Sequence, residues 1–304
     1  MTVEPQSQAQ SLTKNPERRG LRKGLYLVPS AFTAANIGMG FYAVMAAVRG
    51  FQYVGTGSWQ DLIHASTYLD SAAKAIGWAV LFDMLDGRIA RMTRTTTEIG
   101  VQLDSIADVV TFGLAPAVLV YVWGYGATLK EGTDLHQLAW FLSFMYLLCG
   151  AFRLARFNVQ ASRPRILAEG TIKVDKKSFV GLPIPVAGGL IAALIHFTPA
   201  PLLTYGPDRA QLYSLLLMLL MGFLSVLMVS TLRFSSFKTV GTRSRSMRTI
   251  ILVVGVGMLI FLYSRYVLLA IVILYILQGL LARVVSLFRK RGDVSESPVE
   301  AQQT

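Results

Sequence analysis

Long apolar segments alternate with short polar ones along most of this chain, from residue 25 to residue 288. A helix needs about 20 mostly apolar residues to cross a bilayer, and eight segments approach or exceed that length. They cover residues 26–48, 71–93, 99–124, 137–158, 180–198, 211–231, 248–264 and 266–288. The pattern therefore predicts an all-α integral membrane protein, a polytopic bundle of about eight transmembrane helices.

Basic residues are concentrated in every second polar segment. They cluster before the first span, after the second, fourth and sixth spans, and after the last one. The other loops hold little besides Arg49, Lys130, Arg209 and Arg265. Because cytoplasmic loops carry the excess of Lys and Arg, we expect a multi-pass protein of the cell membrane with both termini in the cytoplasm. Merging the last two spans would place the basic C-terminal tail outside.

Composition supports the same class of protein. Hydrophobic residues make up 53% of the chain and charged residues 15%, and the formal net charge is +12. The positive charge lies between apolar spans rather than on one folded surface, so we expect no nucleic-acid partner. The single cysteine, Cys149, excludes an intrachain disulfide framework and a cysteine metal cluster.

Four acidic residues lie in two adjacent predicted spans, within the sequence FDMLDGRIARMTRTTTEIGVQLDSIADVV. Asp83 and Asp86 are three positions apart. Asp104 and Asp108 are four apart, so each pair shares one helix face. The turn between the two helices is short, which makes them antiparallel neighbours. We therefore expect the four carboxylates to converge near the cytoplasmic end of the bundle.

Carboxylates inside a membrane helix are costly and are usually functional. Pairing with nearby arginines explains one acid at a helix end, but membrane acids rarely form a regular group of four. Hard divalent cations would offset their repulsion, and Mg²⁺ or Mn²⁺ suits a set of carboxylates. The small residues Gly87, Ala90 and Gly100 leave room for a bulky polar ligand. The planar guanidinium of Arg91 can bind phosphate.

The same acids allow a different class of protein, a transporter or channel for divalent cations. A transport path would need polar residues through the full depth of several helices, whereas these acids gather at one end of two predicted spans. The pattern therefore favours an enzyme that uses metal ions for phosphoryl transfer.

The acidic segment matches, at every fixed position, the signature of the CDP-alcohol phosphatidyltransferases, D-x2-D-G-x2-A-R-x8-G-x3-D-x3-D. This resemblance implies a six-helix catalytic core, a homodimer, and displacement of CMP from a CDP-linked lipid by an alcohol. By position, it implies that the four aspartates bind two divalent ions and that Asp108 is also the general base. It further implies that Gly87, Arg91 and Thr97 contact the CDP group.

Three other segments resemble the membrane-embedded phosphatidylserine synthases of bacteria and archaea. They are YLVPSAFTAANIGMGFYAV in the first span, FRLARFN at the end of the fourth and GLPIP at the start of the fifth. This resemblance implies CDP-diacylglycerol from the membrane and L-serine as substrates. The chain has Ser30 where the family usually has Asn, and Ser30 and Thr33 are candidates for hydrogen bonds to the nucleotide.

A serine pocket needs a cation for the amino-acid carboxylate. Arg153 and Arg156 are three positions apart near the cytoplasmic end of the fourth span, and Asn158 follows them. Arginines that snorkel to the membrane surface would show the same placement. Other acceptors therefore stay open, namely choline, glycerol 3-phosphate and inositol phosphate. A phosphorylated acceptor would draw on the same arginines and on the basic segment 163–177.

These patterns predict four parts of the chain. Residues 1–23 form a basic, disordered cytoplasmic tail, and residues 24–235 form the catalytic core. A pair of C-terminal transmembrane helices occupies residues 236–290, and a second disordered tail occupies residues 291–304.

Overall fold

The computed structural model describes residues 16–55, 58–93, 98–162, 178–230, 233–235 and 247–292. Inside these ranges, the side chains of several stretches lie outside the description, among them 16–30, 90–93, 178–180, 233–235 and 282–292. The basic segment 163–177 also lies outside the described residues.

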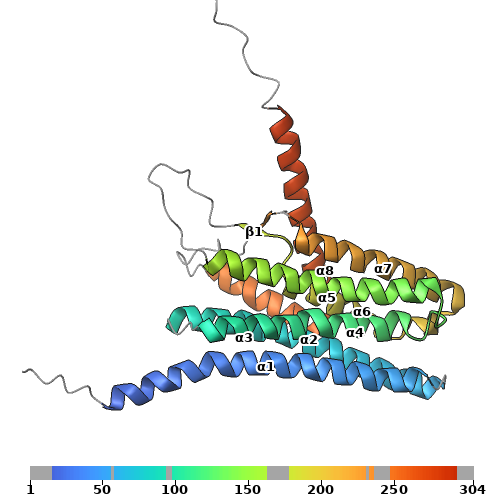
Figure 1. Cartoon of the computed structure of the whole chain (residues 1–304), viewed down its shortest axis with the longest axis horizontal. Coiled ribbons are helices and arrows are strands. Elements are labelled where there is room, and N and C mark those ends of the chain that lie inside the picture. Colours follow the sequence, from blue (N-terminus) through green and yellow to red (C-terminus); the bar gives the residue numbers. More distant parts are fainter. Residues whose placement is uncertain are drawn as a thin grey trace, which may run out of the picture.

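Helices make up nearly all of the described chain. The longest are α1 (Pro16–Val54), α2 (Trp59–Thr93), α5 (Asp134–Ser162), α7 (Pro207–Val229) and α8 (Met247–Gly292). Helix α1 begins inside the predicted N-terminal tail, at a proline, and proline is well suited to the first turn of a helix. Figure 1 shows α1, α5 and α7 with roughly parallel axes.

The third predicted span is one continuous helical rod with two changes of helix type. It consists of α3 (Glu98–Asp108), η1 (Val109–Leu114), α4 (Ala115–Val120) and η2 (Tyr121–Tyr125). The two η segments are π-helices, which are rare and occur often at functional sites. The first of them starts directly after Asp108.

Short elements flank the helix of the fifth predicted span. Helix α6 (Ile184–Phe197) is followed by a 3₁₀ turn, η3 (Leu202–Tyr205). Strand β1 (Ser178–Val180) pairs antiparallel with β2 (Arg233–Ser235), and Phe179 lies opposite Phe234. This small strand pair, which the sequence did not predict, joins the segment before α6 to the segment after α7.

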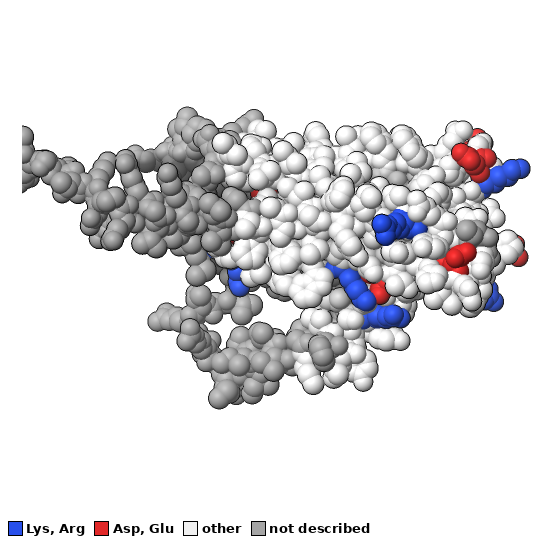
Figure 2. Space-filling model, turned by 90° about the horizontal axis from the view of Figure 1, so that it is seen from below, with Lys and Arg blue, Asp and Glu red and all other residues white. Residues whose placement is uncertain are grey.

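Five helices are long and apolar enough to cross a membrane, by length and composition. They cover Ala31–Val54, Ile99–Tyr125, Asp134–Gln160, Pro207–Val229 and Leu262–Leu281 of the described residues. Helix α6 is apolar but shorter, and α2, which is long, carries the first two aspartates of the acidic segment. On the face seen in Figure 2, most of the described surface between the two ends is uncharged, with a few charged side chains among the white ones. The chain is a polytopic helical membrane protein, as its apolar pattern predicts.

Helix α8 bends at Tyr263, whose φ of −132° and ψ of 43° are not helical. The bend lies beside the predicted break at residues 264–266. The C-terminal part of α8, dark red in Figure 1, leads away from the bundle.

Small side chains hold α1 against α2. Ala43 and Ala47 of α1, like Ala72 and Ala79 of α2, are fully buried. Such residues let the backbones of membrane helices approach closely, where van der Waals packing replaces the hydrophobic effect. Helix α1 also packs on α3 and η1, and α2 packs on α6. The central packing therefore surrounds the two spans that carry the aspartates.

Gly181→Ala is expected to destabilise the fold by about 1–3 kcal/mol. Gly181 follows β1 with a φ of +80°, and a Cβ there would lie 2.4 Å from the carbonyl oxygen of Met228. The melting temperature in detergent should fall by several degrees. Gly189→Ala is the matched control, because its Cβ would meet Val80 at an ordinary 3.9 Å. Equal melting temperatures for both variants would contradict this account of Gly181.

Candidate active site

Three of the four aspartates converge in space. Asp83 lies near the C-terminal end of α2, while Asp104 and Asp108 lie on α3. Each offers a carboxylate oxygen, and these three oxygens lie within 4.8 Å of one another. The spacing along two antiparallel helices predicts this convergence, and the structure confirms it for these residues.

The fourth aspartate, Asp86, lies outside this group of three, interacts with Asp104 and contacts α1. Asp86 is buried and accepts a hydrogen bond from the Thr33 hydroxyl. Its charge also acts on Asp104. Thr33, a predicted nucleotide-binding residue, is itself buried. It is therefore positioned to link the first span to the acidic group.

Three buried polar side chains at this site each have at least one atom without a hydrogen-bond partner among the described residues. Asp108 is 8% exposed, and its Oδ1 has no hydrogen-bond partner among the described residues. Asn36 of α1 is 1% exposed and faces Asp108, but its amide makes no hydrogen bond of good geometry within the described chain. Arg153 of α5 is 7% exposed, and its Nε likewise lacks a described partner. Leaving such groups unsatisfied costs about 1–3 kcal/mol each, which is a cost that a bound polar ligand would offset.

Close packing of α1 on the π-helix brings Asn36 to the site. The Thr111 hydroxyl donates a hydrogen bond to the backbone carbonyl oxygen of Asn36 at 3.0 Å. A Cβ at Gly40 would lie 2.4 Å from that hydroxyl oxygen, so only glycine permits this approach. The sequence analysis did not single out Asn36, which this packing places beside Asp108. An amide inside an apolar span was the available signal.

The donor chemistry of the site fits divalent cations. The charges of Asp83 and Asp104 act on Asp108 unfavourably, and Arg153 is the cation of the described chain whose charge opposes them there. One arginine cannot balance several neighbouring carboxylates. Oxygen ligands of this kind are those that Mg²⁺ and Mn²⁺ prefer. The unpartnered carboxylate oxygen of Asp108 supports the same fit.

Several predicted CDP-binding residues can be placed only by their backbones. Gly87 follows Asp86 on α2, and Gly100 lies on α3 one turn before Asp104. The remaining members lie outside the described side chains, or outside the described residues altogether: Ser30, Ala90, Arg91 and Thr97.

The three residues of the predicted serine pocket have different surroundings. Arg153 lies in the interior near Asp108. Arg156 donates from Nη1 to the Val229 carbonyl oxygen at 3.2 Å, at the end of α7. Asn158 donates from Nδ2 to the Ser105 hydroxyl at 2.9 Å, next to Asp104. Arg153 therefore reaches Asp108, and the bonds of Arg156 and Asn158 join α5 to its neighbours.

A second polar cluster lies away from the four aspartates of the acidic segment, and the sequence analysis did not predict it. His196 of α6 lies at its centre. Its Nδ1 lies 2.5 Å from Asp70 Oδ1 on α2, and its Nε2 lies 3.0 Å from the Ser264 hydroxyl on α8. Asp70 also pairs with Lys74 at 2.7 Å. An acid and a lysine four positions apart at the edge of an apolar span were the available signal.

Known proteins resemble much of this chain in sequence. Residues 26–223 match the family model described as CDP-alcohol phosphatidyltransferase. A CDP-diacylglycerol–serine O-phosphatidyltransferase of Helicobacter pylori is 32% identical over 216 residues, covering 71% of this chain and 75% of the relative. A protein of that name from Bacillus subtilis is 32% identical over 183 residues, covering 58% and 82%. Another, from Methanocaldococcus jannaschii, is 40% identical over 113 residues, covering 37% and 44%.

These matches, together with the converging aspartates, define the class of the protein as a membrane-embedded transferase. The chain belongs to the CDP-alcohol phosphatidyltransferase family.

Proposed function

We propose that this protein transfers the phosphatidyl group of CDP-diacylglycerol to the hydroxyl of L-serine, giving phosphatidylserine and CMP. The observation that carries the proposal is the buried Arg153 beside the aspartate group. It supplies a cation for a carboxylate close to the residues that would handle the diphosphate. The relatives named as serine O-phosphatidyltransferases support the same acceptor.

The four aspartates would hold two Mg²⁺ or Mn²⁺ ions. Bound divalent ions supply charge neutralisation for a diphosphate and stabilisation for the departing CMP oxygen. The fit rests on the three converging carboxylates and on the buried Asp86 beside them. We place the CDP group against α1, α2 and the start of α3. The residues proposed to contact it are Ser30, Thr33, Gly87, Ala90, Arg91, Thr97 and Gly100.

Asp108 is proposed as the general base. It would take the proton of the serine hydroxyl as that oxygen attacks the phosphorus attached to diacylglycerol. A new oxygen–phosphorus bond forms, and the bond from this phosphorus to the bridging oxygen breaks, so that CMP leaves with that oxygen. The unpartnered Oδ1 of Asp108 supports the role, because it has a lone pair available for the proton. Arg156 and Asn158 are proposed to shape the acceptor side of the site through their contacts with α7 and α3.

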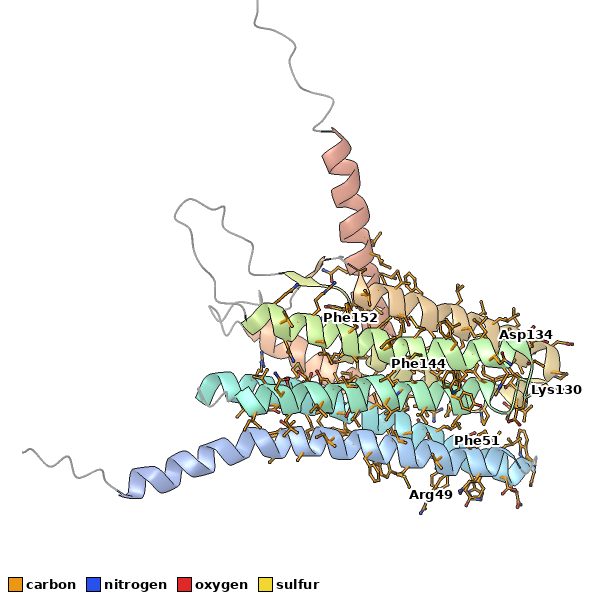
Figure 3. The ribbon with its side chains drawn as sticks, in the orientation of Figure 1. Arg49, Phe51, Lys130, Asp134, Phe144 and Phe152 are labelled. Atoms are coloured by element: carbon orange, nitrogen blue, oxygen red, sulfur yellow. The ribbon has the colours of Figure 1, made fainter. Side chains whose placement is uncertain are left out.

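The active site is proposed to face the cytoplasm, in a homodimer in the cell membrane. The aspartates lie toward the end at which α2 ends and α3 begins. Arg49, Lys130 and Asp134 lie toward the opposite end (Figure 3). The basic segments of the sequence follow α2, α5 and α7 at the aspartate end, and the positive-inside rule assigns such segments to the cytoplasm. The family resemblance supports the dimer.

An acceptor panel tests the proposed reaction. Purified protein in detergent with CDP-diacylglycerol and Mg²⁺ or Mn²⁺ is supplied with one alcohol at a time, and CMP release is measured. We expect release with L-serine and none above background with choline, glycerol 3-phosphate or inositol phosphate.

Two results would redirect the assignment. CMP release that depends on one of the other alcohols would keep the chemistry and replace the acceptor. Divalent-cation flux in liposomes containing CDP-diacylglycerol, without CMP release under any condition, would support the transporter alternative instead.

A further inference from the structure

Helix α8 lies beyond the part of the chain that matches the family model, which ends at residue 223. One face of α8 nevertheless packs on the catalytic bundle. The residues on that face recur every three or four positions: Leu269, Val272, Tyr275, Ile276 and Leu280. Between them, Leu274, Leu277 and Leu281 are exposed. This spacing is that of a helix with one buried stripe.

The cluster of Asp70, His196 and Ser264 fixes the position of α8 along this surface. His196 bonds Asp70 of α2 through one ring nitrogen and Ser264 of α8 through the other. Ser264 comes directly after the bend at Tyr263, so the contact holds the start of the packed half of α8. A buried imidazole with partners on two other helices allows little sliding, because any shift would leave one of its nitrogens unsatisfied.

The same contact sets the rotation of α8 about its axis, and therefore the direction in which Tyr275 points. Three helical turns cover about 11 residues, so Tyr275 lies on nearly the same face as Ser264 and about 16 Å further along the axis. Since Ser264 faces His196 in the bundle, Tyr275 also faces the bundle. It lies within range of an electrostatic interaction with Arg153, the buried arginine next to Asp108.

We propose that Tyr275 is an acceptor-binding residue and that α8 completes the acceptor pocket of this enzyme. The inference rests on the proposed function. The Arg153 guanidinium binds the carboxylate of the amino-acid acceptor, and the Tyr275 hydroxyl donates a second hydrogen bond to it. Two donors on different helices fix the amino acid so that its hydroxyl points toward Asp108. An alcohol without a carboxylate cannot use them.

Tyr275→Phe tests this role. The substitution keeps the ring packing and removes only the hydroxyl, so we expect the KM for L-serine to rise about tenfold. The KM for CDP-diacylglycerol and the kcat at saturating serine should stay within about twofold of the wild type. A merely structural role would move all three quantities together or none of them. Tyr266→Phe, on the same helix with an exposed ring, is the matched control and should leave the serine KM unchanged.

The possible outcomes separate this inference from the proposed function. Serine-dependent CMP release by the wild type, with an unchanged serine KM in Tyr275→Phe, would overturn the role of Tyr275 and leave the reaction standing. Wild-type activity with a non-carboxylate alcohol and none with L-serine would overturn both. A rise in serine KM for Tyr275→Phe alone supports the pocket as described.

Discussion

Asp108→Asn is expected to lower the rate of CMP release by about 10³-fold, which amounts to near-complete loss of turnover. Asparagine has almost the same size as aspartate, so the packing of α1 on α3 and η1 should persist. An amide cannot accept the serine proton, and it is a weaker metal ligand than a carboxylate. The measurement is kcat for purified protein at saturating CDP-diacylglycerol, L-serine and divalent cation.

Binding separates this loss from misfolding. Asp83, Asp86 and Asp104 remain in the variant, so part of the metal site is kept and CDP-diacylglycerol should still raise the melting temperature. Asp134→Asn is a suitable control, because Asp134 is exposed at the other end of the bundle (Figure 3). A turnover rate for Asp108→Asn close to the wild-type rate would show that another group is the base.

Local patterns in the sequence were sufficient for the helical membrane class and for the convergence of three aspartates. Helical periodicity alone places Asp104 and Asp108 on one face, and a short turn brings Asp83 beside them. The break at Ser264 was visible because a polar run interrupts an otherwise continuous apolar stretch. In each case the contacting residues are close in sequence, or the bilayer imposes the pattern.

Contacts between distant helices were not accessible in this way. His196 meets Asp70, which lies 126 positions earlier in the chain. Nothing in the spacing of either residue identifies the other. The same holds for Asn36 beside Asp108, a contact that depends on Gly40 and on the local π-helix. Such pairs are set by which helices pack together and at what rotation, and one apolar pattern is compatible with several packings.

Removing divalent cations is expected to abolish activity and to lower the melting temperature. With excess EDTA, CMP release should fall to below about one hundredth of its starting value, and Mg²⁺ or Mn²⁺ should restore it. Three carboxylates whose oxygens lie within 4.8 Å repel one another without an ion. An ion that binds only the folded protein therefore stabilises it, so the melting temperature should recover on re-addition. In Asp104→Asn this recovery should be much smaller, because one ligand is lost while the helix packing is retained. Full turnover in excess EDTA would mean that the aspartates bind no catalytic metal.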